Sequence, residues 1–310
     1  MSSEGHARIW ESAFAKVNLT LEILGRRSDG YHQLSSLVAF ARDVFDLITL
    51  APGPRLHLEQ TGPAAGNIDG HNIITTAAAA AAAAFPEIRL GQFTLDKQIP
   101  VAAGLGGGSA DAAAALRAIL RANPEDRRLC DDTSDKSSAA FRELCAGIGA
   151  DVSVCFGGGG RSAAIMTGLG EIVWRPDAGS LLPPGLHAVL VNPRHPVTTA
   201  SVFAKLDAPP IGDAIPSSPP GPARFRSLDE VINFLETSRN DLEAPAIAIA
   251  PVISTVLEEI RALRNCCLTR MSGSGATCFG LFTCQPDAEQ AAASLKLKHP
   301  DWWIKPTGLG

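Results

Sequence analysis

The sequence predicts an α+β fold with two lobes. Segments with the period of a strand and segments with the period of a helix follow one another without the strict alternation of a doubly wound sheet. The chain has 310 residues, of which 45% are apolar, so one large or two ordinary domains can bury substantial cores. No internal repeat is visible. We expect an N-terminal domain over residues 1–170 and a C-terminal domain over 171–310, with a proline-rich linker or insertion at 207–223.

The first element is a strand expected at 12–24. Apolar side chains such as Ala13 and Val17 alternate there with polar ones such as Lys16 and Asn18, and a period of two indicates a strand with one buried face. A turn follows at 26–30, and then a helix-like or extended stretch at 34–44.

The remaining elements follow from the same patterns and from proline and glycine stops. Strands are expected at 46–50, 56–59, 92–95, 163–167, 186–192 and 278–283. Helices are expected at 72–85, 110–122, 138–146, 227–236, 251–261 and 287–296.

Composition excludes several classes of protein. A net charge of −5 argues against nucleic acid as the main partner, because a phosphate backbone calls for a basic face. The N-terminus lacks the apolar run of a signal peptide, and no segment has the roughly 18 apolar residues of a membrane span. Seven cysteines without a C-x-x-C pair indicate reduced, buried thiols, and the histidines lack metal-ligand spacing. We therefore expect a cytoplasmic enzyme that acts without a membrane partner.

Residues 100–111 form the most informative segment. Four glycines, Gly104, Gly106, Gly107 and Gly108, lead into Ser109, which is expected to cap an alanine-rich helix. Such a loop brings unpaired backbone N–H groups and the positive end of a helix dipole to a phosphate. It matches neither the P-loop nor the dinucleotide pattern. A bound nucleotide is the first hypothesis, and a flexible surface loop before a capped helix is the open alternative.

Three further signals are weak when each is taken alone. Lys16 lies among apolar neighbours, where a lone lysine is more often on the solvated face of an edge strand. Asp151 follows Gly149 and precedes an apolar run, so it is either a helix cap or a catalytic base. Residues 270–277 form a second loop of small residues, which either binds an anion or simply turns.

Taken together, four segments in this order resemble the GHMP kinase superfamily. They are A-K-V-N-L at 15–19, D-G-Y-H at 29–32, A-A-G-L-G-G-G-S-A-D-A-A-A at 102–114 and G-S-G-A at 273–276. Phe14 departs from the family pattern, which usually has a proline there. The resemblance implies a two-lobed fold with mixed sheets, in which ATP and substrate bind in the cleft between the lobes. It makes the N-terminal domain the ATP-binding and catalytic one and the C-terminal domain the substrate-binding one.

The resemblance also implies roles for single residues. Asp151 matches the catalytic base and Lys16 the lysine beside it, which holds that carboxylate ionised and stabilises developing charge. Mg²⁺ is implied with ATP. The sequence does not identify its ligands: Ser109 is a candidate near the metal and Asp111 a further one, but neither follows from the spacing. ATP contacts are implied at Asn72, Lys97, Pro100, Val101, Ala102, Ala103, Gly104, Leu105, Gly106, Gly107, Gly108, Ser109 and Ala110.

The implied substrate is the cytidine diphosphate conjugate of methylerythritol, phosphorylated on its 2-hydroxyl in the non-mevalonate route to isoprenoid precursors. Substrate contacts are implied at Asn18, Tyr31, His32, Thr199, Phe203, Gly273 and Gly275. A phenol ring can stack on a nucleobase, and a histidine can meet the edge of cytosine. A mevalonate-type kinase and a nucleotide-binding module without catalysis remain the alternatives, and the oligomeric state is not predicted.

Overall fold

The structure is a computed structural model that describes residues 7–67, 72–126, 128–129, 138–176, 179–211 and 224–310. The chain forms two compact units, and each is built from separated stretches. Unit 1 comprises Met1–Phe14, Phe45–Val101 and Gly107–Gly160. Unit 2 comprises Ala15–Val44, Ala102–Gly106 and Arg161–Gly310. Both mix strands and helices, which confirms the α+β prediction.

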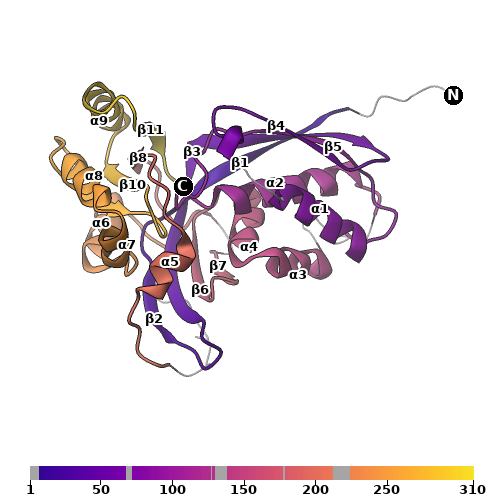
Figure 1. Cartoon of the computed structure of the whole chain (residues 1–310), viewed down its shortest axis with the longest axis horizontal. Coiled ribbons are helices and arrows are strands. Elements are labelled where there is room, and N and C mark those ends of the chain that lie inside the picture. Colours follow the sequence, from indigo (N-terminus) through magenta and orange to yellow (C-terminus); the bar gives the residue numbers. More distant parts are fainter. Residues whose placement is uncertain (1–6, 68–71, 127, 130–137, 177–178, 212–223) are drawn as a thin grey trace. The chain divides into compact units, whose positions relative to one another are not determined.

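Unit 1 consists of a few strands with helices on one face. Figure 1 shows α1 and α2 next to β4 and β5, and α3 and α4 pack against α1 and α2. β5 pairs antiparallel with the second part of β3 and parallel with β4. Its complete strands are β4 (His57–Thr61) and β5 (Leu90–Asp96). Its helices are α1 (Ile73–Ala84), α2 (Gly107–Ala122), α3 (Ala139–Ile148) and α4 (Ala150–Phe156), with short 3₁₀ turns at Ala65–Asn67 and Gly157–Gly160. β1 (Ile9–Asn18) and β3 (His32–Gly53) contribute to both units.

The helices of unit 1 follow sequence signals closely. Alanines at Ala77, Ala78 and Ala81 bury one face of α1, and the helix ends just before Pro86. Ser138 caps α3 through its side chain, as serine favours. The expectation that Ser109 caps α2 is wrong. The helix begins at Gly107, because the left-handed turn at Gly106 (φ +62°) lies immediately before it, so Ser109 lies inside the first turn.

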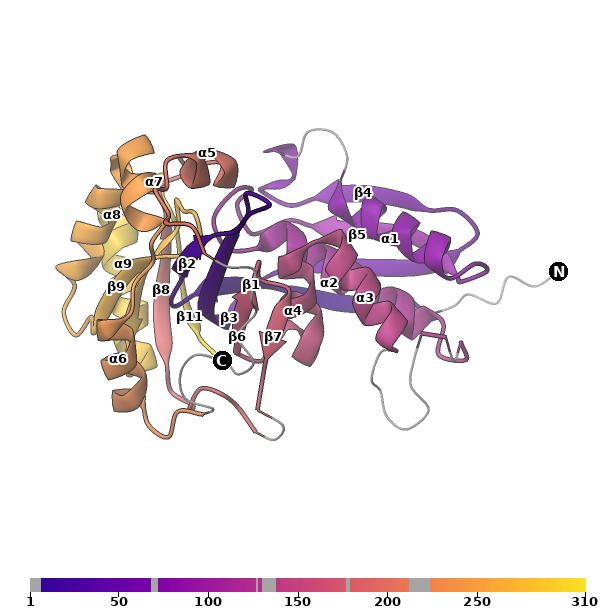
Figure 2. The ribbon, with the colours of Figure 1, turned by 90° about the horizontal axis from the view of Figure 1, so that it is seen from below.

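Unit 2 contains a four-stranded antiparallel sheet in the order β11-β8-β10-β9 and further strands that pair with the first part of β3. Figure 2 shows α6, α8 and α9 beside this sheet. The strands are β2 (Glu22–Arg26), β6 (Ala164–Gly168), β7 (Ile172–Trp174), β8 (His187–Asn192), β9 (Leu268–Met271), β10 (Cys278–Phe282) and β11 (Trp303–Gly308). The helices are α5 (Thr199–Ala204), α6 (Leu228–Thr237), α7 (Glu243–Ile249), α8 (Val252–Arg261) and α9 (Gln285–Lys298).

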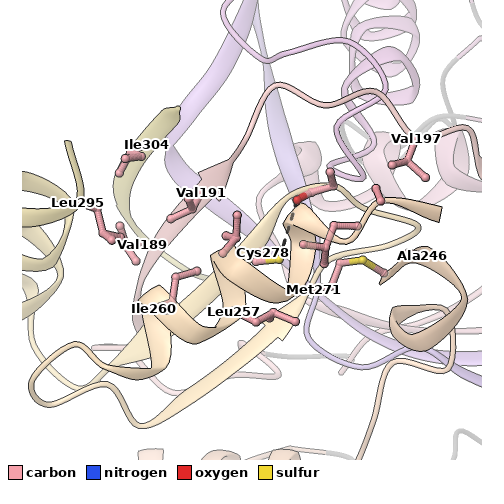
Figure 3. Packing of buried hydrophobic residues seen from close by; sticks show 14 of the residues in the cluster. Val189, Val191, Val197, Ala246, Leu257, Ile260, Met271, Cys278, Leu295 and Ile304 are labelled. Atoms are coloured by element: carbon pink, nitrogen blue, oxygen red, sulfur yellow. Dashed lines mark hydrogen bonds between the residues drawn. The ribbon is translucent and has the colours of Figure 1, made fainter. Parts of the chain in front are cut away.

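The core of unit 2 lies between the four-stranded sheet and the helices that cover it. Figure 3 shows Leu257 and Ile260 of α8 in one apolar cluster with Val189 and Val191 of β8. Burying such side chains contributes about 1.5–3 kcal/mol each. This core supports the loop after β9, which carries two of the predicted substrate residues.

Two strand predictions need correction. The strand expected at 12–24 is broken into β1 and β2, because the amides of Leu19 and Thr20 both donate to the carbonyl of Leu37 and interrupt the pairing. The helix-like stretch at 34–44 and the strand at 46–50 are one continuous strand, β3. The short elements α5, α7, β7, β9 and β11 were missed, since three to seven residues give too little periodicity.

The proline-rich segment at 207–223 lies mostly outside the described residues. Its first part is tied to β2, because the amide of Arg26 donates to Pro209 and the amide of Ile211 donates to Arg26. None of the helices that the structure describes is long and apolar enough to span a membrane.

Candidate active site

β1 carries Lys16 and Asn18 into the interior of unit 2, where only 3% and 4% of their surfaces are exposed. The expected half-buried strand with a solvated polar face is therefore wrong. Loop and side-chain polar groups cover that face instead of water. The amide of Lys16 donates to the carbonyl of Leu105 (2.8 Å), and the side-chain amide of Asn18 donates to Ser36 Oγ (2.8 Å).

The first part of the glycine loop, Ala102–Gly106, packs tightly against a second loop of unit 2. A Cβ on Gly104 would lie 2.4 Å from the carbonyl oxygen of Ser272, and Gly104 has a left-handed backbone (φ +74°). Ser272 Oγ donates to the carbonyl of Gly104 (2.9 Å) and accepts from the amide of Asn18 (3.0 Å). Only glycine fits at this contact, so the loop's glycines serve close packing as well as ligand approach.

The side chain of Lys16 lies against the end of the same loop. A Cβ on Gly106 would come within 3.1 Å of Lys16 Cε. The glycine therefore leaves room for the lysine beside the last residue before α2. Within unit 2, the predicted catalytic cation and the predicted phosphate loop are neighbours.

The loop after β9 is held by side chains of other segments. Asn240 Nδ2 donates to the carbonyls of Met271 (2.8 Å) and Gly273 (2.9 Å). The hydroxyls of Ser274 and Thr199 are hydrogen bonded at 2.9 Å. Since Thr199 is the first residue of α5, this bond ties the loop after β9, with Gly273 and Gly275, to the helix that carries Phe203.

The residues predicted to bind the cytosine base also lie together in unit 2. The rings of His32 and Phe203 lie with centroids 5.2 Å apart and planes inclined by 37°. Tyr31 is 64% exposed, an unusual state for a large aromatic side chain. Burial, and to a lesser extent the charge of Arg26, lowers the pKa of His32 below its ordinary value. The imidazole is therefore neutral near pH 7 and offers one donor and one acceptor.

Unit 1 holds Asp151, the predicted catalytic base. Asp151 is the second residue of α4. The N-cap of this helix is Gly149, and no side chain caps it, so the interpretation of Asp151 as a helix cap is wrong. A carboxylate in the first helical turn is favoured by the dipole. Because Asp151 belongs to unit 1 and Lys16 to unit 2, their pairing stays a prediction.

Asn72 and Lys97, two of the predicted ATP contacts, already have strong partners in unit 1. Asn72 caps α1 by accepting from the amide of Ile74 (2.8 Å). Lys97 Nζ lies 2.5 Å from Asp46 Oδ2 and 2.6 Å from Asp111 Oδ2. Burial alone would lower the pKa of Lys97, but the two carboxylates outweigh it and the pKa is raised. Burial raises the pKa of Asp111 well above its ordinary value.

The structure thus groups the predicted residues into two sets. Unit 2 holds Lys16, Asn18, Tyr31, His32, Ala102, Ala103, Gly104, Leu105, Gly106, Thr199, Phe203, Gly273 and Gly275. Unit 1 holds Asn72, Lys97, Pro100, Val101, Gly107, Gly108, Ser109, Ala110 and Asp151. The described residues contain no cluster of three or more His, Cys, Asp or Glu side chains suited to a metal ion.

Sequence reasoning missed three polar residues that organise the two sets. Ser272 and Ser274 lie in the small-residue loop that was singled out, but a serine among glycines gives no sign of which hydroxyl is buried. Asp46 had a usable signal, since an aspartate inside an apolar strand segment is rare unless it is paired.

Comparison with known proteins agrees with this geometry. The family described as GHMP kinases N terminal domain matches residues 72–168, and GHMP kinases C terminal matches residues 223–301. The crystal structure of homoserine kinase from Cytophaga hutchinsonii shares the fold, with a TM-score of 0.64 at 17% identity over 99% of this chain and 96% of the other. The chain belongs to the GHMP kinases and is a small-molecule kinase.

Relatives narrow the class further. A protein of Methylorubrum extorquens is 46% identical over 95% of this chain and 97% of its own, and one of a Bradyrhizobium species is 43% identical over 96% and 95%. Both are named 4-diphosphocytidyl-2-C-methyl-D-erythritol kinase. A crystal structure of 4-(cytidine 5'-diphospho)-2C-methyl-D-erythritol kinase matches with a TM-score of 0.70 at 29% identity, over 97% of this chain and 99% of the other. Within the GHMP kinases, the chain belongs with these enzymes.

Proposed function

We propose that the protein transfers the γ-phosphate of ATP to the 2-hydroxyl of 4-diphosphocytidyl-2-C-methyl-D-erythritol, a step of the non-mevalonate route to isoprenoid precursors. The observation that carries the substrate assignment is the pair of His32 and Phe203, with ring centroids 5.2 Å apart and the exposed Tyr31 next in sequence. Relatives that bear the name of this activity, at 43–46% identity over nearly the whole chain, support it.

The cytosine base is recognised by stacking and by hydrogen bonds. The exposed ring of Tyr31 and the ring of Phe203 provide apolar faces, and neutral His32 meets the polar edge of the base. Asn18, Thr199, Gly273 and Gly275 contact the rest of the substrate. The hydrogen bond between Thr199 and Ser274 fixes α5, which carries Phe203, next to the loop after β9, which carries Gly273 and Gly275.

ATP is bound by the segment from Pro100 to Ala110, with Asn72 and Lys97 toward the adenine. The unpaired amides of the first turn of α2 and its positive dipole end favour phosphate oxygens. The close fit of Gly104 on Ser272 and of Gly106 on Lys16 supports a loop whose shape is fixed before the nucleotide arrives.

In the chemical step, Asp151 takes the proton of the 2-hydroxyl as that oxygen attacks the γ-phosphate. Lys16 stabilises negative charge on the attacking and transferred oxygens. Phosphoryl transfer depends mainly on positioning and charge neutralisation, so one carboxylate, one ammonium and an array of backbone amides are sufficient protein groups.

Mg²⁺ accompanies ATP, and the residues at the loop fit its demands in part. Mg²⁺ takes oxygen ligands and is usually held by one or two protein groups together with phosphates and waters. The half-buried Ser109, in the first turn of α2, is the candidate ligand. Asp111 fits poorly, because it is 2% exposed and one of its oxygens already accepts from Lys97. The ion would neutralise charge on the phosphates.

Two wider assignments belong to this proposal. Residues 1–170 contribute mainly to ATP binding and catalysis and residues 171–310 to substrate binding, which the boundaries of the two family matches support. The enzyme works in the cytoplasm. Its six described cysteines are all free thiols, in agreement with a reducing compartment.

The test is ATP consumption with the cytidine substrate beside mevalonate and homoserine. Turnover with the cytidine substrate alone is expected, together with inhibition by CMP or CDP. Turnover with mevalonate alone would keep the kinase chemistry and refute the substrate. Absence of turnover with all three would favour a nucleotide-binding module without catalysis.

A further inference from the structure

A buried cluster of three charged side chains lies in unit 1. Asp46 is fully buried, and Lys97 and Asp111 are 3% and 2% exposed. The ammonium of Lys97 contacts one oxygen of each carboxylate, at 2.5 Å for Asp46 and 2.6 Å for Asp111. Buried charges are expensive to desolvate, and apolar side chains of similar volume would stabilise a core at least as well. The cluster therefore calls for an explanation other than stability.

Asp46 does more than pair with Lys97. Its second oxygen, Oδ1, accepts from the backbone amides of Gln98 (2.5 Å) and Ile99 (2.8 Å). These are the residues that follow β5 and precede the glycine loop. A carboxylate that accepts from two consecutive amides fixes that piece of backbone strongly, since charge-assisted hydrogen bonds are the strong ones.

Lys97 connects Asp46 to the other end of the loop. A Cβ on Gly107, the first residue of α2, would lie 3.2 Å from Lys97 Nζ, so the ammonium lies directly beneath the start of this helix. Asp111, one turn further along α2, accepts from the same ammonium. The two chain segments that flank the loop, 97–99 and 107–111, are thus both held by one buried ion cluster.

The two carboxylates do not contribute equally. Asp46 accepts three hydrogen bonds with its two oxygens. Among the described residues, Oδ1 of Asp111 has no hydrogen-bond partner, although the side chain is buried. Asp46 is therefore the more strongly held carboxylate of the cluster, and Asp111 is the less strongly held one.

We propose that Asp46 is a positioning residue for the nucleotide, which holds the two ends of the glycine loop at the separation that the triphosphate requires. Asp46 does not touch the nucleotide; it acts through the amides of Gln98 and Ile99 and through Lys97. The inference rests on the proposed function, in that it takes the loop as the ATP site.

The decisive variant is Asp46→Asn. The amide oxygen of asparagine can still accept from Gln98 and Ile99, but the charged contact to Lys97 is lost. We expect the KM for ATP, and the Kd of a non-hydrolysable ATP analogue, to rise about tenfold, which corresponds to the loss of one charge-assisted hydrogen bond. The KM for the cytidine substrate should not change, and kcat should stay within about threefold of the wild type.

Asn123→Ala is the matched control in the same unit. Asn123 is 3% exposed and hydrogen bonds the backbone of Arg89 and Ile119 at the far end of α2. Its loss should lower the melting temperature without changing the KM for ATP. Asp46→Ala should raise the KM for ATP more than Asp46→Asn does and should accelerate amide exchange at 98 and 99.

The outcomes separate this inference from the proposed function. Failure of the wild-type protein to bind the analogue would contradict the ATP site itself. Wild-type binding together with an unchanged ATP KM in folded Asp46→Asn would overturn the positioning role. If Asp46→Asn does not fold, Asp46→Ala/Lys97→Met is compared with Lys97→Met. Both variants lack the Lys97 ammonium, so neither contains a buried positive charge that has lost the carboxylate of Asp46. A further severalfold rise in ATP KM is expected, and equal values would overturn the proposal.

Discussion

Ser272 Oγ donates a hydrogen bond to the carbonyl of Gly104 at 2.9 Å, and the same oxygen accepts from the amide of Asn18 at 3.0 Å. One buried hydroxyl thereby joins β1, the glycine loop and the loop after β9. These three segments come from widely separated parts of the sequence, and each carries predicted site residues. Ser272 has no predicted catalytic role in phosphoryl transfer, but it fixes the relative positions of three segments that carry predicted site residues.

Replacement of Ser272 by alanine is expected to reduce both stability and turnover. The change leaves the buried amide of Asn18 without an acceptor, which costs about 1–3 kcal/mol in the free energy of unfolding. It also removes the hydrogen bond that holds the carbonyl of Gly104, so the glycine loop is less well positioned and kcat should fall. Urea unfolding and steady-state kinetics measure the two effects. Ser138→Ala, which removes the N-cap of α3, is the control for a loss of stability alone. Equal kcat values for the two variants would contradict a role of Ser272 in the site.

A second prediction concerns Gly106 and Lys16. Gly106→Ala introduces a Cβ that would lie 3.1 Å from Lys16 Cε, on a backbone with φ +62°. Gly159→Ala is a close control, since Gly159 has φ +65° and no atom within 4 Å of the added Cβ. Both should lose about 1–2 kcal/mol from the left-handed backbone. Only Gly106→Ala should also lower kcat/KM, by about tenfold or more, as Lys16 is displaced. A similar decrease in both variants would show that backbone strain alone is responsible.

How far the sequence predicts this site depends on the kind of interaction. The helices α1, α3, α6 and α8 were predicted within one or two residues, because capping residues and apolar periods are local signals. The burial of Lys16 was not predicted, since it depends on a loop some 90 residues later that covers its strand. The roles of Ser272 and Asp46 are likewise long-range. The apolar neighbours of Asp46 in sequence indicate that its carboxylate is paired, but no local pattern identifies the partner, and none indicates that Ser272 is buried.

The aromatic pair offers a test of substrate recognition. Phe203→Ala removes the ring beside His32 and should raise the KM for the cytidine substrate about tenfold, because stacking on a base contributes about 1–3 kcal/mol. The KM for ATP should not change. Phe234→Ala is the control, since Phe234 pairs with Phe225 at a centroid distance of 5.3 Å, similar to the 5.2 Å of the His32 pair. An equal effect of both substitutions on substrate KM would refute stacking by Phe203.

The lowered pKa of His32 predicts a pH dependence. Burial and the charge of Arg26 disfavour the imidazolium, so neutral His32 persists to a lower pH than an ordinary histidine does. Below its pKa, the cation has no acceptor nitrogen for the base edge. The KM for the cytidine substrate should therefore rise as the pH falls below the usual 6.5, whereas the KM for ATP should be less affected. The unfolded state binds this proton more readily, so His32 contributes stability above about 6.5 that is lost toward acid pH. In His32→Asn, the acid-side rise in substrate KM should disappear; its persistence would exclude His32 as the group that titrates.

Asp151→Asn tests the predicted base. Loss of a general base typically lowers the rate by about 10²–10⁴-fold, and asparagine keeps the size of the side chain. Because Asp151 is the second residue of α4, the substitution also removes a charge that the helix dipole stabilises by about 0.3–1 kcal/mol. Asp229→Asn separates these effects, since Asp229 is the second residue of α6. Both variants should remain folded in urea unfolding, and only Asp151→Asn should lose turnover in single-turnover assays at saturating ATP and substrate. If Asp151→Asn retains a rate within about threefold of Asp229→Asn, the proton of the 2-hydroxyl leaves by another route, and Asp151 is not the base.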